Sequence, residues 1–250
     1  MRKFGLIGYP LGHSFSQKYF TEKFKLEKIS DCSYENFPLK NIEELSDLIR
    51  ENSDLCGLNV TIPYKTEILR YIDVSEPAIK EIGAVNVLKI KRIEGKIQLC
   101  GYNSDVVGIS DSIKPFFLDK SGNVLILGTG GSSRAVLYTM KKMGFNVTLV
   151  SRKNKPGVLS YSEISPAILE RMDLIVNTTP LGMFPDISTK PDLQYEFLGE
   201  RHILFDLVYN PEITSFLKIG KAQGCKIITG LKMLYSQADR SWEIWNDPSL

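Results

Sequence analysis

Short apolar runs recur along the second half of the chain, each followed by a polar or amphipathic segment. Runs of this kind are typical of strands that are buried on both faces of a parallel sheet. Strands that alternate with helices predict a parallel sheet with right-handed crossovers. The expected strands are residues 124–127, 147–150, 174–176, 203–205 and 227–228.

Helices are expected between these strands. A glycine-rich turn at residues 128–131 precedes apolar residues at helical spacing over 136–143. Asn210 and Pro211 predict the start of another helix, because asparagine is a good N-cap and proline suits the first helical position. A long helix is expected over residues 230–246, and its apolar stripe ends in aromatic residues that need a partner surface in the first domain.

The first hundred residues alternate between strand-like and helix-like segments. Apolar positions at helical spacing predict a helix over 15–24, and Asn41 with Glu44 resembles a capping box that opens another helix. The expected strands are residues 4–7, 58–61 and 85–90, the last paired with 96–100 as a hairpin around Glu94-Gly95. The whole pattern predicts an α/β protein of two domains.

Composition narrows the class of protein. Of 250 residues, 43% are hydrophobic and 24% are charged, which excludes extensive disorder. A net charge of +2 gives no electrostatic footprint for nucleic acid or an anionic membrane. No apolar stretch is long enough to span a bilayer, and the N-terminal apolar run is too short for a signal peptide. We therefore expect a cytoplasmic protein. The sequence does not fix its oligomeric state, so monomer and homodimer both stay open.

Cysteine and histidine are few. The four cysteines form no CxxC pair and are interpreted as reduced thiols, and only His13 and His202 offer imidazole ligands. We therefore expect no metal site. His13 is interpreted as a hydrogen-bonding loop residue and His202 as a structural one.

The glycine-rich turn predicts a dinucleotide site. Gly128-Thr129-Gly130-Gly131-Ser132 follows a strand and opens a helix, where backbone N–H groups can approach a pyrophosphate closely. The alternative is a simple glycine-rich turn. The next strand ends in Ser151-Arg152-Lys153 rather than in an acid that would bind ribose hydroxyls, which favours NADP over NAD. The alternative for these residues is a solvated basic turn.

Lys65 and Asp105 are the candidate catalytic pair. Each follows a strand-like run, in Asn59-Val60-Thr61-Ile62-Pro63-Tyr64-Lys65 and in Gly101-Tyr102-Asn103-Ser104-Asp105. A lysine beside a substrate hydroxyl can give and take the proton of reversible alcohol–ketone chemistry, and an aspartate can orient it. The alternatives are a surface lysine after a proline turn and a helix-capping aspartate.

Small polar residues near the expected strand ends could hold a hydroxylated acid. Ser14 and Ser16 could hold a carboxylate at a helix N-terminus, although both could instead be ordinary capping residues. Asn59, Thr61, Asn86 and Asn103 lie where open α/β sheets bind ligands.

These segments together resemble the shikimate dehydrogenase family over nearly the whole chain. The resemblance also rests on Gly8-Tyr9-Pro10, His13-Ser14-Phe15-Ser16, Gly83-Ala84-Val85-Asn86, residues 177–183, residues 206–211 and residues 230–234 with Gln237. It implies NADP-dependent interconversion of 3-dehydroshikimate and shikimate.

The resemblance also implies domains and residue roles. An N-terminal α/β substrate domain would comprise residues 1–110 and 235–250. Residues 111–234 would form a Rossmann-like doubly wound NADP domain. Lys65 and Asp105 would be catalytic. Ser14, Ser16, Thr61, Asn86, Tyr209 and Gln237 would hold the substrate. Gly128, Thr129, Gly130, Gly131, Ser132, Ser151, Arg152, Lys153, Leu207 and Gly230 would contact NADP.

Some positions depart from the family pattern without removing a catalytic group. They are Gln17 for a proline, Tyr19-Phe20 for a histidine–asparagine pair, Val87 and Ser104 for threonines, and Ser151 and Lys153 for an asparagine and a threonine. Two alternative functions stay open. One is a related dehydrogenase that takes quinate or uses NAD. The other is a non-catalytic protein that senses NADP or a metabolite.

Overall fold

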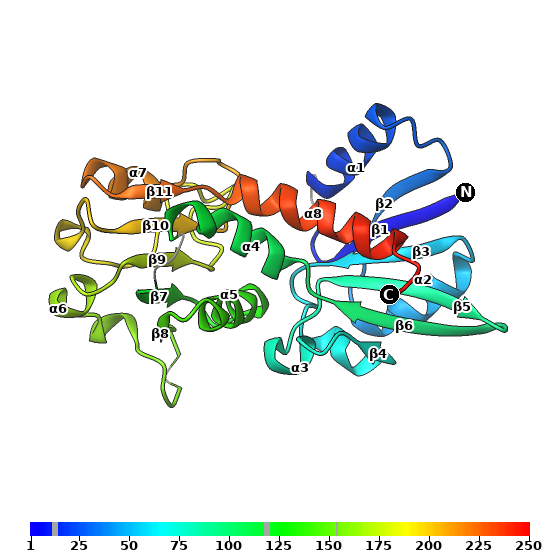
Figure 1. Cartoon of the computed structure of the whole chain (residues 1–250), viewed down its shortest axis with the longest axis horizontal. Helices are drawn as coiled ribbons and strands as arrows, with labels where there is room; N and C mark the ends of the chain where they lie inside the picture. Colours follow the sequence, from blue (N-terminus) through cyan, green and yellow to red (C-terminus); the bar gives the residue numbers. More distant parts are fainter. Residues whose placement is uncertain (12–14, 118–120, 154) are drawn as a thin grey trace. The chain divides into compact units, whose positions relative to one another are not determined.

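The computed structural model describes residues 1–11, 15–117, 121–153 and 155–250 (Figure 1). Ser14 and His13 therefore lie outside the described residues. The chain divides into two compact units, residues 1–104 with 238–250 and residues 105–237. Residues 105–110 and 235–237, which the sequence analysis assigns to the first domain, belong to the second unit.

The described residues of the first unit form a mixed sheet of six strands in the order β2-β1-β3-β5-β6-β4. β1 pairs in parallel with β2 and β3, whereas β5 is antiparallel to both β3 and β6. The strands are β1 (Arg2–Gly8), β2 (Cys32–Pro38), β3 (Leu55–Val60), β4 (Val74–Ser75), β5 (Val87–Ile93) and β6 (Lys96–Tyr102). The helices are α1 (Phe15–Leu26), α2 (Leu45–Glu51) and α3 (Ile79–Ile82), with short 3-10 helices at Ile42–Glu44 and Glu67–Tyr71.

Two local predictions for this unit are confirmed. β5 and β6 form the expected hairpin, and its turn uses positive φ angles at Glu94 and Gly95. The Asn41 backbone N–H donates to Glu44 Oε1 at 3.2 Å, which is one half of a capping box. The box opens a 3-10 turn that continues directly into α2.

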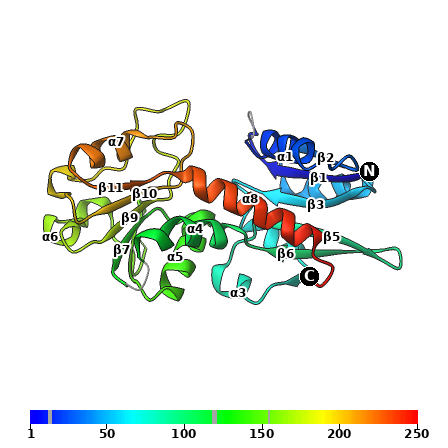
Figure 2. The ribbon, with the colours of Figure 1, turned by 45° about the horizontal axis from the view of Figure 1, so that its top comes forward.

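An aromatic cluster joins the C-terminal helix to the first sheet. α8 (Gly230–Asn246) begins in the second unit and ends in the first, as its apolar stripe predicts. The Trp245 ring stacks on Phe4 with centroids 4.8 Å apart, and its Nε1 donates to the Leu88 carbonyl at 2.9 Å. Gly57 lies beneath this indole, where a Cβ would collide with Trp245. Figure 2 shows α1 lying over β1 and β2, where Phe20 joins the same cluster.

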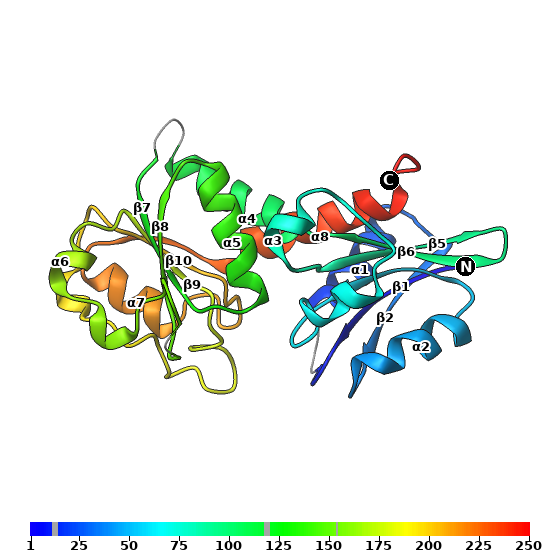
Figure 3. The same ribbon diagram turned by 90° about the horizontal axis from the view of Figure 1, so that it is seen from below.

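In the second unit, the described residues form a sheet of five parallel strands in the order β11-β10-β9-β7-β8. α5 and α7 lie on opposite faces of it (Figure 3). The strands are β7 (Asn123–Leu127), β8 (Asn146–Val150), β9 (Leu174–Asn177), β10 (Ile203–Asp206) and β11 (Lys226–Ile228). The helices are α4 (Asp105–Ile113), α5 (Gly131–Lys142), α6 (Pro166–Leu169) and α7 (Ser215–Ala222), with 3-10 helices at Lys114–Phe116, Tyr161–Glu163 and Tyr195–Phe197.

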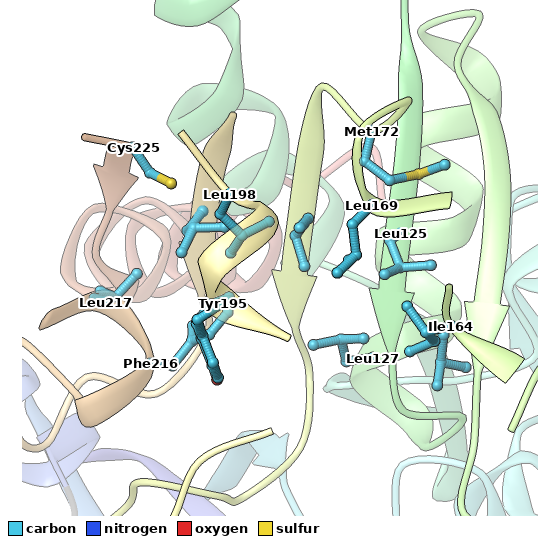
Figure 4. Close-up of a cluster of buried hydrophobic side chains, with 13 residues drawn as sticks. Leu125, Leu127, Ile164, Leu169, Met172, Tyr195, Leu198, Phe216, Leu217 and Cys225 are labelled. Atoms are coloured by element: carbon cyan, nitrogen blue, oxygen red, sulfur yellow. The ribbon is translucent and has the colours of Figure 1, made fainter. Parts of the chain in front are cut away.

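The core of this unit explains why its strands are apolar throughout. Successive side chains of a strand point to opposite faces, and both faces of this sheet carry helices. Leu125 and Leu127 of β7 pack in one cluster with Leu169 of α6 and with Phe216 and Leu217 of α7 (Figure 4). Val124 and Ile126, whose side chains point to the other face, are buried as well, so the apolar part of the strand shows no alternation.

One predicted helix start is wrong. α7 begins at Ser215 rather than at Pro211, and its N-cap is Thr214. The Thr214 hydroxyl accepts the Leu217 N–H at 3.4 Å and donates to Asp206 Oδ2 at 2.6 Å. Asn210 instead lies in a turn, where its carbonyl accepts the Phe184 N–H at 3.0 Å. A threonine held by a buried carboxylate therefore caps the helix in place of the asparagine.

Two wider features of the chain complete the fold. All four cysteines are free thiols, as the sequence analysis expects. Across the described ranges, no helix combines the length and the apolar character needed to cross a membrane.

Candidate functional site

The ends of β1 and β3 and the start of the antiparallel strand β5 bring two predicted substrate residues to one edge of the first sheet. The Thr61 N–H, just after β3, donates to the Ile7 carbonyl of β1 at 2.9 Å. The Val60 N–H donates to the Asn86 carbonyl at 2.8 Å, so Asn86 lies beside the end of β3. Carboxyl ends of adjacent parallel strands are where open α/β sheets bind ligands. Thr61 and Asn86 thus lie together at such an edge.

The turn that carries Lys65 is fixed by its neighbours. The Tyr64 N–H donates to the Thr61 carbonyl at 2.9 Å, and the buried Tyr64 hydroxyl donates to the Leu39 carbonyl at 2.7 Å. The Lys65 carbonyl accepts the Val85 N–H at 2.8 Å, which ties the turn to the segment before Asn86. The half-buried Lys65 is therefore held on a rigid turn next to Thr61 and Asn86.

Buried polar side chains connect to this edge. Asn86 Oδ1 accepts the Ser104 N–H at 2.7 Å, and Asn86 Nδ2 donates to Ser104 Oγ at 3.0 Å. Asn59 Oδ1 accepts the Tyr34 hydroxyl at 2.8 Å, and Asn59 Nδ2 donates to Ser241 Oγ at 2.9 Å. Burial raises the pKa of Tyr34, so its hydroxyl stays protonated and remains a donor.

Tyr34 and Ser241 are residues that the sequence analysis does not single out. A signal for Ser241 was present, because it is a small polar residue on the apolar face of the C-terminal helix, three residues after Ala238 and four before Trp245. No comparable signal pointed to Tyr34, because the strand that carries it was not predicted.

Among the described residues, the remaining catalytic and substrate candidates belong to the second unit, apart from Ser16. Asp105 is the first residue of α4 and is 3% exposed, a position where a helix N-terminus stabilises a carboxylate. Tyr209 follows β10 and is 36% exposed. Gln237 lies on α8 and its Nε2 donates to the Leu234 carbonyl at 2.9 Å. Ser16 lies in α1 of the first unit, where its side chain hydrogen bonds with Tyr34.

The glycine-rich turn has the geometry of a phosphate cradle. Gly128 has a φ of +113°, and its N–H donates to the Val150 carbonyl at 2.8 Å. Such a φ strongly favours glycine. Gly130 precedes the first turn of α5, and a Cβ built on it would meet no atom within 4 Å. The open space therefore lies directly in front of a helix N-terminus, where anions bind.

Basic and hydroxyl side chains surround the end of β8. Arg152 and Lys153 are exposed, and the Lys153 N–H donates to Ser151 Oγ at 3.2 Å. A surface depression is lined by Arg152, Lys155, Ser160 and Ser162, together with Pro156, Val158 and Glu163, whose Oε2 accepts from Ser160 Oγ at 2.7 Å. Guanidinium, ammonium and hydroxyl donors around one depression suit a phosphate group.

Leu207 and Gly230 lie against each other beyond β10. A Cβ on Gly230 would lie 2.7 Å from the Leu207 carbonyl oxygen and 2.8 Å from that of Val208. Only glycine permits this close approach of two backbone segments. The Leu207 N–H donates to the Asn177 carbonyl at 3.0 Å, which fixes the segment to the end of β9.

Asp206 is a fully buried carboxylate at the end of β10. Its oxygens accept from Thr214 Oγ1 at 2.6 Å, Asn177 Nδ2 at 3.0 Å and the Val208 N–H at 3.0 Å. Burial nevertheless raises its pKa to about 6, because desolvation of the charge outweighs these hydrogen bonds. The folded protein thus binds the proton of the Asp206 carboxyl group more tightly than the unfolded chain does.

The raised pKa of Asp206 predicts a pH dependence of stability. A folded pKa of about 6 against 3.8 means that the contribution of Asp206 is fully present below about pH 4 and is lost as the pH rises to about 6. The loss is about 2–3 kcal/mol of unfolding free energy. We measure the free energy of unfolding by urea denaturation at several pH values. As the pH rises from about 4 to about 6, this free energy should fall less in the variant Asp206→Asn than in the unmodified protein. The exposed control Asp186→Asn should behave like the unmodified protein, and an equal fall in all three would contradict the prediction.

Within the described ranges, no cluster of three or more histidine, cysteine or acidic side chains could hold a metal ion. His202 is buried, where its Nδ1 accepts the Gly199 N–H at 2.9 Å.

The comparison with known proteins decides the family. Residues 6–88 match the profile described as the shikimate dehydrogenase substrate binding domain. A shikimate dehydrogenase (NADP(+)) of Methanococcus aeolicus is 35% identical, over 96% of this chain and 90% of its own length.

The chain belongs to the shikimate dehydrogenase family. A crystal structure of a shikimate dehydrogenase in complex with NADP+ has a TM-score of 0.87 and 32% identity, covering 98% of this chain and 90% of that chain. The enzyme from Thermus thermophilus, in complex with NADP(H) and shikimate, has a TM-score of 0.85 and 30% identity, covering 100% of this chain and 96% of that chain. The two-sheet α/β fold is thus the fold of the shikimate dehydrogenase family.

Proposed function

We propose that this shikimate dehydrogenase family member catalyses the reversible, NADP-dependent reduction of 3-dehydroshikimate to shikimate. The observation that carries the proposal is the edge of the first sheet, where Thr61, Lys65 and Asn86 lie on one rigid set of strand ends. A proton donor beside hydrogen-bonding side chains is what the reduction of a hydroxylated ketone requires.

NADP fits the second unit. The backbone of Gly128 to Gly131 and the Ser132 side chain would hold the pyrophosphate, since the space before α5 is open. Arg152, which lines the depression, would hold the 2′-phosphate together with the neighbouring Ser151 and Lys153, and Leu207 with Gly230 would line the site by their backbone. When bound, NADPH supplies the hydride that reduces the substrate carbonyl.

Lys65 handles the proton. In the direction of reduction, its Nζ donates a proton to the carbonyl oxygen as that oxygen gains negative charge. In the direction of oxidation, Nζ takes the proton back from the hydroxyl, so one group serves both directions. Asp105 orients the lysine and accepts a hydrogen bond from a substrate hydroxyl.

Six residues would hold the substrate. Ser14 and Ser16 would hold its carboxylate, and Thr61, Asn86, Tyr209 and Gln237 would bind its hydroxyls. The first unit would then form the substrate domain and the second unit the NADP domain. The protein would act in the cytoplasm as a monomer or homodimer.

The specificity constants of four substrate–cofactor pairs test this assignment. We expect kcat/KM to be highest for shikimate with NADP, and to fall by about tenfold or more when NAD replaces NADP, because the basic residues then lose their phosphate. A preference for NAD would overturn the cofactor, and a preference for quinate would overturn the substrate. Tight binding of shikimate and NADP without turnover would support the alternative of a non-catalytic sensor protein.

A further inference from the structure

A chain of buried hydrogen bonds runs through the first unit and crosses the C-terminal helix at Ser241. One branch leads from Ser241 to Asn59 and Tyr34, and through the Tyr34 hydroxyl to Ser16. The other leads to Ser104, whose Oγ lies 3.2 Å from Ser241 Oγ. Ser104 in turn holds the Asn86 amide through both its N–H and its hydroxyl. Through Ser241, the helix is thus linked to Asn59 directly and to Asn86 by way of Ser104.

The loss of one of these hydrogen bonds is costly because the groups that form them are buried. Ser104 and Ser241 have no exposed surface, Asn86 is 3% exposed and Asn59 is 6% exposed. A buried polar group that loses its partner pays the full cost of desolvation, which exceeds the usual net contribution of a hydrogen bond. Removal of the Ser241 hydroxyl would take from Asn59 Nδ2 its 2.9 Å acceptor and leave a contact with the Asn86 carbonyl at 3.4 Å.

The consequence would be transmitted to Asn86. Ser104 Oγ accepts a hydrogen bond from Asn86 Nδ2 and is also within hydrogen-bond distance of Ser241 Oγ. Without Ser241, Ser104 Oγ loses one of the partners that fix its position, and the amide of Asn86 loses part of what fixes its orientation. The Asn59 side chain can also turn toward the Asn86 carbonyl, which is the second route to the same residue.

We propose that Ser241 is a positioning residue of the substrate site, which acts through Ser104 and Asn59 to hold the Asn86 amide toward the substrate hydroxyls. The inference rests on the proposed function, because it takes Asn86 to be a substrate-binding residue. Ser241 does not touch the substrate. Its place on the C-terminal helix gives that helix a part in substrate affinity in addition to its part in the aromatic core.

Steady-state kinetics of Ser241→Ala tests the proposal. We expect the KM for shikimate to rise about 5- to 30-fold, while the KM for NADP stays within about twofold and kcat within about threefold. A merely structural residue would lower thermal stability without separating the two KM values. Ser241→Cys, which replaces the hydroxyl by a slightly larger thiol that is only a weak acceptor, should show the same direction of change.

Ser112 offers a matched control. It is 2% exposed, and its hydroxyl donates to the Gly108 carbonyl within α4 at 2.7 Å, away from the network. Ser112→Ala makes the same chemical change in a buried helix and should leave the KM for shikimate within about twofold. Comparing Ser241→Ala with Ser112→Ala separates the general effect of losing a buried hydroxyl from the specific effect of losing the Ser241 hydroxyl.

A double-mutant cycle with Asn86→Ala identifies the route. If Ser241 acts through Asn86, adding Ser241→Ala to Asn86→Ala should raise the KM for shikimate by less than about twofold. Independent effects in the cycle, or an unchanged KM in Ser241→Ala, would overturn the inference while the unmodified protein still turns over shikimate. An unmodified protein that neither binds nor oxidises shikimate would instead overturn the proposed function and the inference together.

Discussion

Replacing Lys65 by alanine is expected to lower kcat for shikimate oxidation by about 10²- to 10⁴-fold, which is the range that general acid–base catalysis contributes. The loss falls on kcat because the proton moves in the transition state, whereas the residues proposed to hold NADP belong to the second unit. The affinity for NADP, measured by calorimetry, should therefore change by less than about twofold. Initial rates over a range of shikimate concentrations give kcat and KM separately.

A matched control distinguishes this role from a general effect of lost charge. Lys80 is an exposed lysine on α3 of the same unit, and Lys80→Ala should keep kcat within about twofold. Normal turnover in Lys65→Ala would contradict the mechanism. A large fall in both lysine variants would show that charge on this unit, rather than proton transfer, limits the rate.

Arg152 should decide the choice of cofactor. We expect Arg152→Ala to lower kcat/KM for NADP by about 10- to 100-fold, because a charge-assisted hydrogen bond to a phosphate is lost. The kcat/KM for NAD should stay within about threefold, since NAD has no 2′-phosphate to lose. The ratio of the two specificity constants is the measurement, because it cancels any effect on catalysis or folding.

Arg201 supplies the control for this variant. It is an exposed arginine of the same unit, 3.4 Å from Asp173 and not among the residues that line the depression at Arg152. Arg201→Ala should leave the NADP to NAD ratio unchanged. If Arg152→Ala also leaves it unchanged, the depression does not hold the phosphate, and another basic residue must account for any preference.

The second unit could be predicted well because burial dominates it. Its strands are covered on both faces, so they appear in the sequence as uniform apolar runs, and each ends in a short turn. The turn at Gly128 was visible as glycines between an apolar run and an amphipathic helix, and the φ of +113° at Gly128 explains the first of them. The C-terminal helix was visible from its stripe, and Trp245 packs on Phe4 as that stripe requires.

Other parts depend on tertiary contacts that the sequence does not show. β2 was missed because only Tyr34 is buried in it, and the strand otherwise carries polar residues that would suit a loop. The start of α7 was missed because its cap, Thr214, is held by Asp206, which lies eight residues earlier. Local capping preferences could not reveal this long-range partner.

The buried network shows a different limit. Asn59 and Ser241 are 182 residues apart, and neither has a local pattern that predicts the contact. The sequence signal for such a contact is a single polar residue on an apolar helix face, and Ser241 is such a residue. What decides their role is which partner they meet, and that is a property of the folded chain.

The most direct test of the central claim is the near-ultraviolet absorbance of NADPH after purified protein is mixed with shikimate and NADP. The account predicts a rise that requires the protein, shikimate and NADP together, and that is slower by orders of magnitude with Lys65→Ala. No rise from a folded protein that binds NADP would contradict the claim that this chain is a shikimate-oxidising enzyme.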